Sequence, residues 1–346
     1  MTLQTADSAT RGTPLKGFAK LVVTGIRREA DAVVSLSLTS PDGGPLPPWA
    51  PGEHVDVRFA NGILRQYSLC SDPADPAVWR VAVLREEAGR GGSRYVHEAL
   101  HSGDAVDVRG PKNNFRGTAG AGEKVFIAGG IGITAVLPMA RAAQRAGESW
   151  HLLYLGARLG SMAFLEEIAA LDPAGGRVRI HAKDQHGSLD LTAYLDGGAV
   201  PAEATVYACG PSRLLDGVRA LHATGRLPYL MTEDFGREDA EETADRGGAD
   251  PGAALARKDS RFVVETADGR EIEVAPEESI LDALQKSGVP ALNSCRKGSC
   301  GTCETVVLGG IPDHRDEILS DEERASNDIM MICVSRCQGE KLVLDI

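Results

Sequence analysis

Four cysteines have the spacing of metal ligands: Cys295, Cys300, Cys303 and Cys333. The first three lie in the segment NSCRKGSCGTCE at 293–304, in the pattern Cys-x4-Cys-x2-Cys, and the fourth precedes a last apolar stretch. This pattern is that of a plant-type [2Fe–2S] site, in which four thiolates hold two irons. Gly298 and Gly301 favour it, because glycine lets the loop curl and lets backbone N–H groups approach the sulfurs.

A structural zinc site is the main alternative for these cysteines. Structural zinc usually takes cysteines in two closely spaced pairs, and Cys333 has no such companion upstream. Cys337 follows it after a gap too loose for a zinc knuckle, so we interpret Cys337 as a free thiol. A disulfide framework fits less well still. The sequence therefore predicts an iron–sulfur cluster.

Composition and charge limit what the rest of the chain does. A chain of 346 residues is long enough for two or three domains. It has no long apolar run and a polar N-terminus, which predicts neither a membrane span nor a secretory signal. The remaining cysteines are scattered, which suits the reducing cytoplasm. A formal net charge of −12 disfavours nucleic acid and anionic membranes as partners. For the oligomeric state we expect a monomer.

Short alternating strands dominate the first part of the chain. Residues 1–14 form a polar tail that we expect to be disordered. Over 15–118, turn signals separate apolar stretches that predict a small antiparallel β-barrel. The predicted strands are at 18–26, 32–40, 54–60, 63–69, 79–86 and 104–110.

Two short motifs lie in this barrel: Arg65, Gln66, Tyr67 and Ser68 at the end of a strand, and Gly91, Gly92 and Ser93 at the start of a helix. A helix start behind two glycines exposes unpaired N–H groups that suit a phosphate. Arg65 could add a bidentate partner, Tyr67 could lie on an isoalloxazine ring, and Ser68 could hydrogen-bond its reactive edge. Each motif alone is also explained by an ordinary strand or turn. Their presence in one barrel favours a flavin.

Strands and helices alternate over 119–232, which predicts a parallel α/β sheet. Its first turn, GGIGIT at 129–134, would let a pyrophosphate approach the backbone at a helix start, although it is not a standard Rossmann turn. Cys209, Gly210 and Pro211 end the last long predicted strand, at the edge where ligands of such sheets bind. For Cys209 itself, the residues favour a small buried hydrophobe.

The C-terminal part has the pattern of a β-grasp fold. A charged, Ala- and Gly-rich segment at 233–257 predicts a linker. Over 258–346 we predict a hairpin turning at Asp268 and Gly269, a helix capped by Ser279, the cysteine loop and a late strand. This order of elements matches a ferredoxin domain.

In this order, the motifs RQYS, GGS, GGIGIT, CGP, EDFG and CRKGSCGTC resemble those of the phthalate dioxygenase reductase family. The family includes the reductases of vanillate demethylase and other two-component Rieske oxygenases. The resemblance runs from about residue 17 to the end and implies three modules in the order FMN, NAD and plant-type [2Fe–2S]. Ferredoxin-NADP reductase shares only the first two modules, and many other oxygenase reductases carry the ferredoxin at the opposite end.

The resemblance also implies roles for individual residues. Ser68, Cys209 and Phe235 are the predicted catalytic positions, with Phe235 covering the flavin face that nicotinamide must reach. The predicted cofactor-binding residues are Arg65, Gln66, Tyr67, Ser68, Ala82, Val83, Leu84, Gly91, Gly92, Ser93, Gly130, Gly132, Thr134, Arg158, Cys209, Gly210, Pro211 and Phe235.

One departure concerns the choice of nucleotide. After the second strand of the sheet, relatives can present an acidic residue near the adenosine ribose, where this chain has Arg158. An acid there would reject a 2′-phosphate and an arginine could accept one. NADH is expected from the family, and NADPH stays open.

The implied function is that of an oxygenase reductase component. NADH would give a hydride to FMN, and single electrons would pass through the cluster to a terminal Rieske oxygenase of aromatic catabolism. A plant-type cluster near roughly −400 mV would feed a Rieske centre downhill. No side chain is expected to act as a general acid or base. A reductase for a di-iron or P450-type oxygenase, or a passive electron carrier, are the alternatives.

Overall fold

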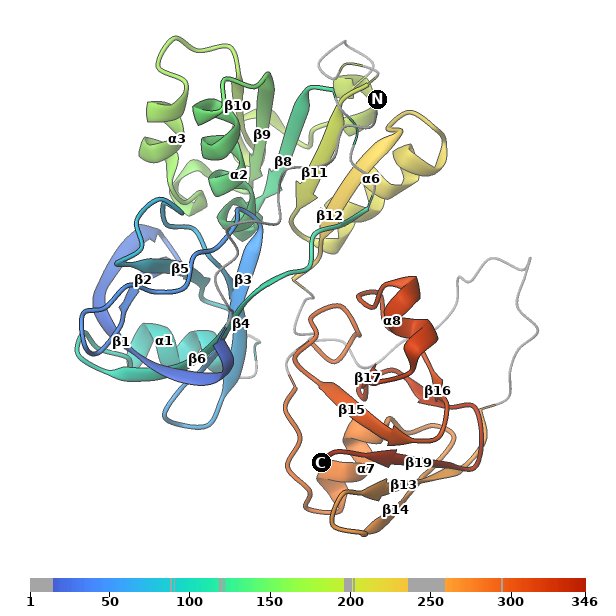
Figure 1. Cartoon of the computed structure of the whole chain (residues 1–346). Coiled ribbons are helices and arrows are strands. Elements are labelled where there is room, and N and C mark those ends of the chain that lie inside the picture. The colour runs from blue at the N-terminus through green and yellow to red at the C-terminus, as the bar shows by residue number, and fades with distance from the viewer. Residues whose placement is uncertain are drawn as a thin grey trace, which may run out of the picture. The chain divides into compact units, whose positions relative to one another are not determined.

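The computed structural model describes residues 15–87, 89, 91–117, 120, 122–195, 201, 203–235, 259–293 and 295–346. The chain divides into two compact units, 1–235 and 236–346 (Figure 1). The predicted tail at 1–14 and nearly all of the predicted linker lie outside the described residues, and the module boundaries near 118 and 257 stay predictions. In the described ranges, no helix has the length and apolar character needed to cross a membrane.

The first sheet of unit 1 is antiparallel and has six strands: β1 (Leu15–Ala30), β2 (Val33–Thr39), β3 (Glu53–Arg58), β4 (Leu64–Ser68), β5 (Trp79–Leu84) and β6 (Ala105–Asn113). Their order is β4-β3-β6-β1-β2-β5. A bridge between Leu69 and Val81 joins the two edges, as closure toward a barrel requires. Helix α1 (Gly92–Glu98) follows β5. The predicted barrel is confirmed, with a first strand longer than expected.

The second sheet of unit 1 is mainly parallel: β8 (Lys124–Gly129), β9 (Trp150–Gly156), β10 (Val178–Ala182), β11 (Thr205–Cys209), β12 (Tyr229–Glu233) and the short antiparallel β7 (Arg116–Gly117). The order is β10-β9-β8-β11-β12-β7, so the direction of winding reverses between β8 and β11. Ligands bind outside the strand ends at such a reversal. The prediction that β11 is the last long strand is wrong, because β12 is equally long.

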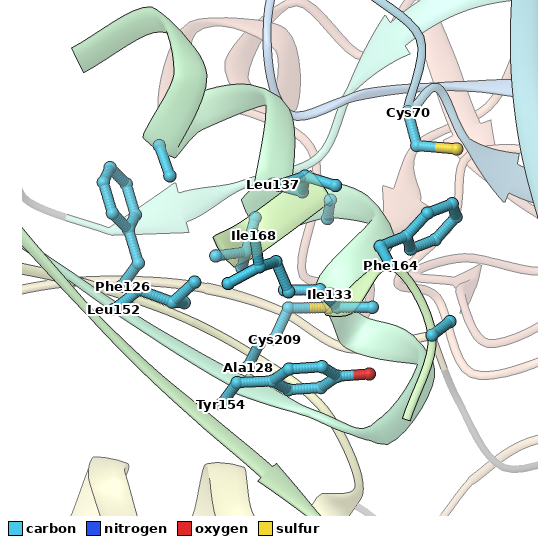
Figure 2. Packing of buried hydrophobic residues seen from close by; sticks show 14 of the residues in the cluster. Cys70, Phe126, Ala128, Ile133, Leu137, Leu152, Tyr154, Phe164, Ile168 and Cys209 are labelled. Atoms are coloured by element: carbon cyan, nitrogen blue, oxygen red, sulfur yellow. The ribbon is translucent and has the colours of Figure 1, made fainter. Parts of the chain in front are cut away.

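Helices connect these parallel strands: η1 (Gly130–Gly132), α2 (Ile133–Arg145), η2 (Leu159–Ser161), α3 (Leu165–Leu171), α4 (Lys183–His186), α5 (Leu191–Tyr194) and α6 (Ser212–Ala223). In the core, Ile133 and Leu137 of α2 pack over Ala128 and Leu152 of the sheet (Figure 2). The first turn of α2 is therefore anchored at the strand edge where a nucleotide would bind.

The described part of unit 2 contains a mixed sheet, a separate two-stranded sheet and two helices. The elements are β13 (Phe262–Thr266), β14 (Glu271–Val274), α7 (Ile280–Lys286), β15 (Glu304–Gly309), β16 (Pro312–Asp313), α8 (Asp321–Ser326), β17 (Ile329–Met331), β18 (Arg336–Cys337) and β19 (Lys341–Leu344), of which β16 and β18 form the two-stranded sheet. The main sheet runs β14-β13-β19-β15-β17, with β13 and β19 parallel. The hairpin turn has Gly269 at φ +82°, and Ser279 caps α7 by accepting the Asp282 N–H. The β-grasp prediction is confirmed.

A partly buried ion network connects the barrel to the parallel sheet. Arg80 of β5 forms two hydrogen bonds with the Glu167 carboxylate of α3, at 2.7 and 2.8 Å. Arg141 of α2 binds the same carboxylate, and both arginines donate to the Cys70 carbonyl. Burial alone would raise the pKa of Glu167, but hydrogen bonds and charge from Arg80 and Arg141 lower it below its ordinary value.

We expect E167Q to lower the free energy of unfolding of unit 1 by about 1–3 kcal/mol at neutral pH, because two partly buried arginines lose their charged partner. A carboxylate whose pKa is lowered by folding stabilises the fold while it is ionised. The difference from wild type should therefore shrink as pH falls below the ordinary glutamate value of 4.5. Urea unfolding followed by tryptophan fluorescence measures this, since Trp49, Trp79 and Trp150 all lie in unit 1.

The matched control is E166Q, because Glu166 is the exposed neighbour on the same helix. An equal loss in E166Q, or a loss in E167Q that does not change with pH, would contradict the role of the network.

Candidate functional site

The four predicted ligand cysteines come together in two pairs. The thiols of Cys295 and Cys300 hydrogen-bond each other, as do those of Cys303 and Cys333. The contact with Cys300 lowers the pKa of Cys295 to about 5 and raises that of Cys300. In the second pair, the contact raises the pKa of Cys303 and lowers that of Cys333. One sulfur of each pair thus already favours the thiolate form that a metal needs.

Two pairs suit two irons better than one zinc. A [2Fe–2S] cluster takes two thiolates on each iron, whereas a zinc ion needs three or four ligands around one point. The arrangement therefore fits the cluster and not the zinc alternative.

The backbone of the cysteine loop is shaped for this arrangement. Arg296, Gly298 and Gly301 have φ values of +60°, +76° and +72°. A Cβ on Gly298 would lie 2.7 Å from Val334 Cγ2, so only glycine fits there. The Lys297 N–H donates to the Cys295 sulfur at 3.3 Å. Backbone N–H groups that point at the ligand sulfurs stabilise charge on them.

Cys337 lies outside the two pairs. Its backbone pairs with Pro312, and its sulfur accepts a hydrogen bond from the Gly339 N–H at 3.2 Å. Burial raises the pKa of this thiol. These contacts agree with the prediction that Cys337 is a free thiol.

In the barrel, the two predicted phosphate motifs touch each other. A Cβ on Gly92 would lie 2.8 Å from Arg65 Nε, so the guanidinium rests directly against the first residue of α1. The helix starts one residue earlier than predicted, and Gly91 precedes it at φ +85°. Ser93 Oγ accepts the Glu86 N–H at 3.1 Å. An anion placed here would meet a positive charge and the open end of a helix together.

Next to this motif, Ser68 is part of a group of buried polar side chains. Ser68 pairs across the sheet with His54, which places both side chains on one face. His54 Nδ1 lies 3.6 Å from Glu233 Oε1 at the end of β12. Among the described residues, Ser68 Oγ, both ring nitrogens of His54 and Glu233 Oε2 have no hydrogen-bond partner. Because such atoms are costly to bury, they indicate a polar ligand at this position.

The glycine turn and the CGP motif of the parallel sheet also meet. A Cβ on Gly132 would overlap the Cys209 carbonyl and lie 2.8 Å from the Gly210 nitrogen. A Cβ on Gly129 would lie 2.8 Å from Pro211 Cδ. The two motifs thus form one backbone surface at the carboxyl edge of β8 and β11.

Cys209 and Thr134 are both buried in this region. Cys209 lies in the core beside Ile133 (Figure 2), and burial, with smaller effects of Glu233 and Asp234, keeps its pKa well above the ordinary value. It is a neutral thiol, as the interpretation as a small buried residue requires. Thr134 Oγ1 donates to the Ile131 carbonyl at 2.9 Å, so its hydroxyl stabilises the turn.

The other predicted residues lie around these motifs. Ala82, Val83 and Leu84 are in β5, which contacts η1, and Val83 accepts a hydrogen bond from His97. Gln66 and Tyr67 lie in β4 beside Ser68. Phe235 is a large apolar side chain that is 38% exposed. The Arg158 side chain is exposed in the turn after β9.

Comparison with known proteins agrees with this arrangement. Residues 263–338 match the 2Fe-2S iron-sulfur cluster binding domain. A relative named phenoxybenzoate dioxygenase subunit beta, from Ectopseudomonas oleovorans, is 38% identical and covers 94% of this chain and 97% of its own. The crystal structure of a phthalate dioxygenase reductase, 33% identical, matches 95% of this chain and 98% of its own with a TM-score of 0.65.

The chain belongs to the phthalate dioxygenase reductase family. It is an oxidoreductase, the reductase component of an oxygenase system, and it has a 2Fe-2S iron-sulfur cluster binding domain. The chain is also similar to part of a type IV self-sufficient cytochrome P450 monooxygenase, with 37% identity and a TM-score of 0.75, and it spans 41% of that longer protein.

Two residues of the site were not predicted from the sequence. The sequence predicts no chemical role for the histidines and assigns Glu233 to the linker. Both belong to the buried group at Ser68. The sequence shows only that His54 alternates with Val55 and Val57 along a strand, and its position opposite Ser68 becomes known only with the pairing of β3 and β4.

We expect C303S to lose most of its iron and acid-labile sulfide, because one iron then keeps a single protein thiolate. C337S should keep the wild-type content, since Cys337 lies outside both pairs. Metal analysis of anaerobically purified protein measures both variants. Equal iron loss in C337S, or zinc in place of iron in the wild type, would show that the ligand set is wrong.

Proposed function

We propose that this protein takes electrons from NADH and passes them singly to the terminal oxygenase of a two-component Rieske system. One observation carries the proposal: the same chain contains the two cysteine pairs, the contact of Arg65 with Gly92 and the contact of Gly132 with Cys209. FMN supplies the exchange between electron pairs and single electrons, and the cluster supplies one-electron transfer. The side chains position these groups.

At the flavin, Arg65 and the N–H groups at the start of α1 bind the phosphate. The contact between Arg65 and Gly92 supports this role, because both donors reach one point. Ser68 donates a hydrogen bond to the reactive edge of the ring, which gives its buried hydroxyl the partner that it otherwise lacks. The backbone of Ala82 to Leu84 lies along the ring system.

At the nicotinamide, the surface formed by Gly132, Cys209 and Gly210 receives the ring and its ribose. No Cβ at Gly132 or Gly210 blocks the approach of the backbone. The neutral Cys209 thiol adds bulk without charge, so it fixes position and does not act as a nucleophile. Phe235 shields the flavin until nicotinamide displaces it, which its partial exposure permits.

His54 and Glu233 complete the polar side of the flavin site. His54 Nδ1 and Glu233 Oε1 are 3.6 Å apart, and His54 lies opposite Ser68 across the strand pair. Both ring nitrogens of His54 and Glu233 Oε2 are buried without a hydrogen-bond partner among the described residues, so a polar group of a bound ligand could pair with them. Their role is to position the ligand.

A P450-type acceptor is the second candidate, favoured by the likeness to part of a self-sufficient P450. A di-iron acceptor has no such support, and a passive carrier would not need the buried polar group at Ser68. We further propose that the protein works in the cytoplasm as a monomer. None of its seven cysteines forms a disulfide, which suits a reducing compartment.

The test is electron delivery to purified acceptors. Under NADH, the protein should reduce a Rieske oxygenase of an aromatic substrate, and omission of either component should stop the reaction. Reduction of a P450 and not of any Rieske protein would favour the second candidate. Absence of NADH oxidation with every acceptor would reject the proposed function.

We expect R65Q to weaken FMN binding about 10- to 100-fold, because the variant loses a charge-assisted hydrogen bond to the phosphate. Riboflavin lacks the phosphate, so its affinity should change less than about threefold by the same reasoning. Fluorescence titration of flavin-free protein measures both ligands. R58Q is the control, because Arg58 pairs with Asp107 in the same barrel. Equal weakening of FMN and riboflavin would contradict phosphate binding by Arg65.

A further inference from the structure

An aspartate from the barrel reaches the turn that carries Arg158. Asp31 lies between β1 and β2, and its backbone N–H donates to the Gly160 carbonyl at 2.8 Å. Its Oδ2 is 4.0 Å from Arg158 Nη2. A Cβ on Gly160 would lie 2.8 Å from the same oxygen. An acidic side chain is therefore present where the neighbouring sequence offers only a basic one.

This turn stands at the carboxyl edge of the parallel sheet. β9 ends at Gly156, and the Asp184 N–H after β10 donates to the Ala157 carbonyl at 3.0 Å, so the turns after both strands lie together. In dinucleotide-binding sheets, the adenosine ribose lies near the end of the second strand. An acid there accepts the 2′-hydroxyl of NADH, and an arginine accommodates the 2′-phosphate of NADPH.

The geometry of Asp31 suits ligand binding better than fold stability. Its side chain is 50% exposed and that of Arg158 is 65% exposed, and ion pairs so exposed contribute little to stability. Arg28 Nη2 lies 3.3 Å from Asp31 Oδ1, and Arg158 Nη2 lies nearest the other carboxylate oxygen, Oδ2. The carboxylate is thus oriented toward the turn and open to solvent.

We propose that Asp31, contributed by the barrel, determines the preference of this chain for NADH over NADPH. The inference rests on the proposed function and assigns its nucleotide specificity. The Asp31 carboxylate accepts a hydrogen bond from the ribose 2′-hydroxyl. It repels a 2′-phosphate and partly neutralises Arg158, the one basic residue of this turn. The turn after β9 has no acidic residue of its own, and Asp31, which lies between β1 and β2 more than a hundred residues earlier, supplies one.

The experiment compares binding of NADP⁺ and NAD⁺ to the full-length protein with its cofactors, measured by calorimetry. D31N should bind NADP⁺ about tenfold more tightly, because a negative charge near the phosphate is removed. NAD⁺ affinity should change less than about threefold, since asparagine still accepts a hydrogen bond. The double variant D31N/R158Q should lose the gain. High salt should reduce the gain in D31N, as expected for charge repulsion.

D184N is the matched control, because Asp184 is the acid at the end of the neighbouring strand; its NADP⁺ affinity should stay at the wild-type value. Unchanged NADP⁺ binding in D31N, a gain in D184N instead, or an equal change for both nucleotides would overturn the proposal. Retained NAD⁺ binding shows that each variant is folded. Failure of the proposed function is distinct, because it would appear in the wild type as flavin that NADH does not bleach.

Discussion

Buried polar atoms without partners are the constraint on which the site depends. Ser68, His54 and Glu233 come from β4, β3 and β12, and together they leave four polar atoms without a hydrogen bond among the described residues. Each such atom costs about 1–3 kcal/mol when it stays unsatisfied. The parallel pairing of β11 with β12 places Glu233 beside Cys209. These atoms lie where we propose that the flavin binds, and a bound ligand would supply the partners that they lack.

A different constraint governs the C-terminal unit. Its cysteine loop needs three residues at positive φ, and one of them is Arg296, a residue type that rarely adopts this conformation. Arg296 is held there by hydrogen bonds to Asp282 and Gln285 of α7. The helix therefore supports the loop that presents the sulfurs in pairs. In this chain, α7 therefore stabilises the backbone of the residue that follows the ligand Cys295.

Local patterns in the sequence predict much of this structure. Local chemistry explains the cysteine spacing, the glycine turn and the RQYS and GGS motifs. The patterns of apolar residues predict the antiparallel strands of the barrel and the parallel strands of the second sheet. The contact between Gly132 and Cys209 could be anticipated, because both motifs end parallel strands at one edge. The partnership of His54 with Glu233 could not, since it depends on how the barrel packs against β12. The position of Asp31 depends on the same packing.

The central claim is that electrons enter as a pair from NADH and leave singly through iron. The most direct test is anaerobic addition of NADH to the full-length protein, followed by flavin absorbance and by low-temperature EPR of frozen samples. The account predicts that the flavin bleaches and that the signal of a reduced [2Fe–2S] cluster then appears, while C303S shows bleaching alone. A wild-type protein whose flavin bleaches without any cluster signal would contradict it.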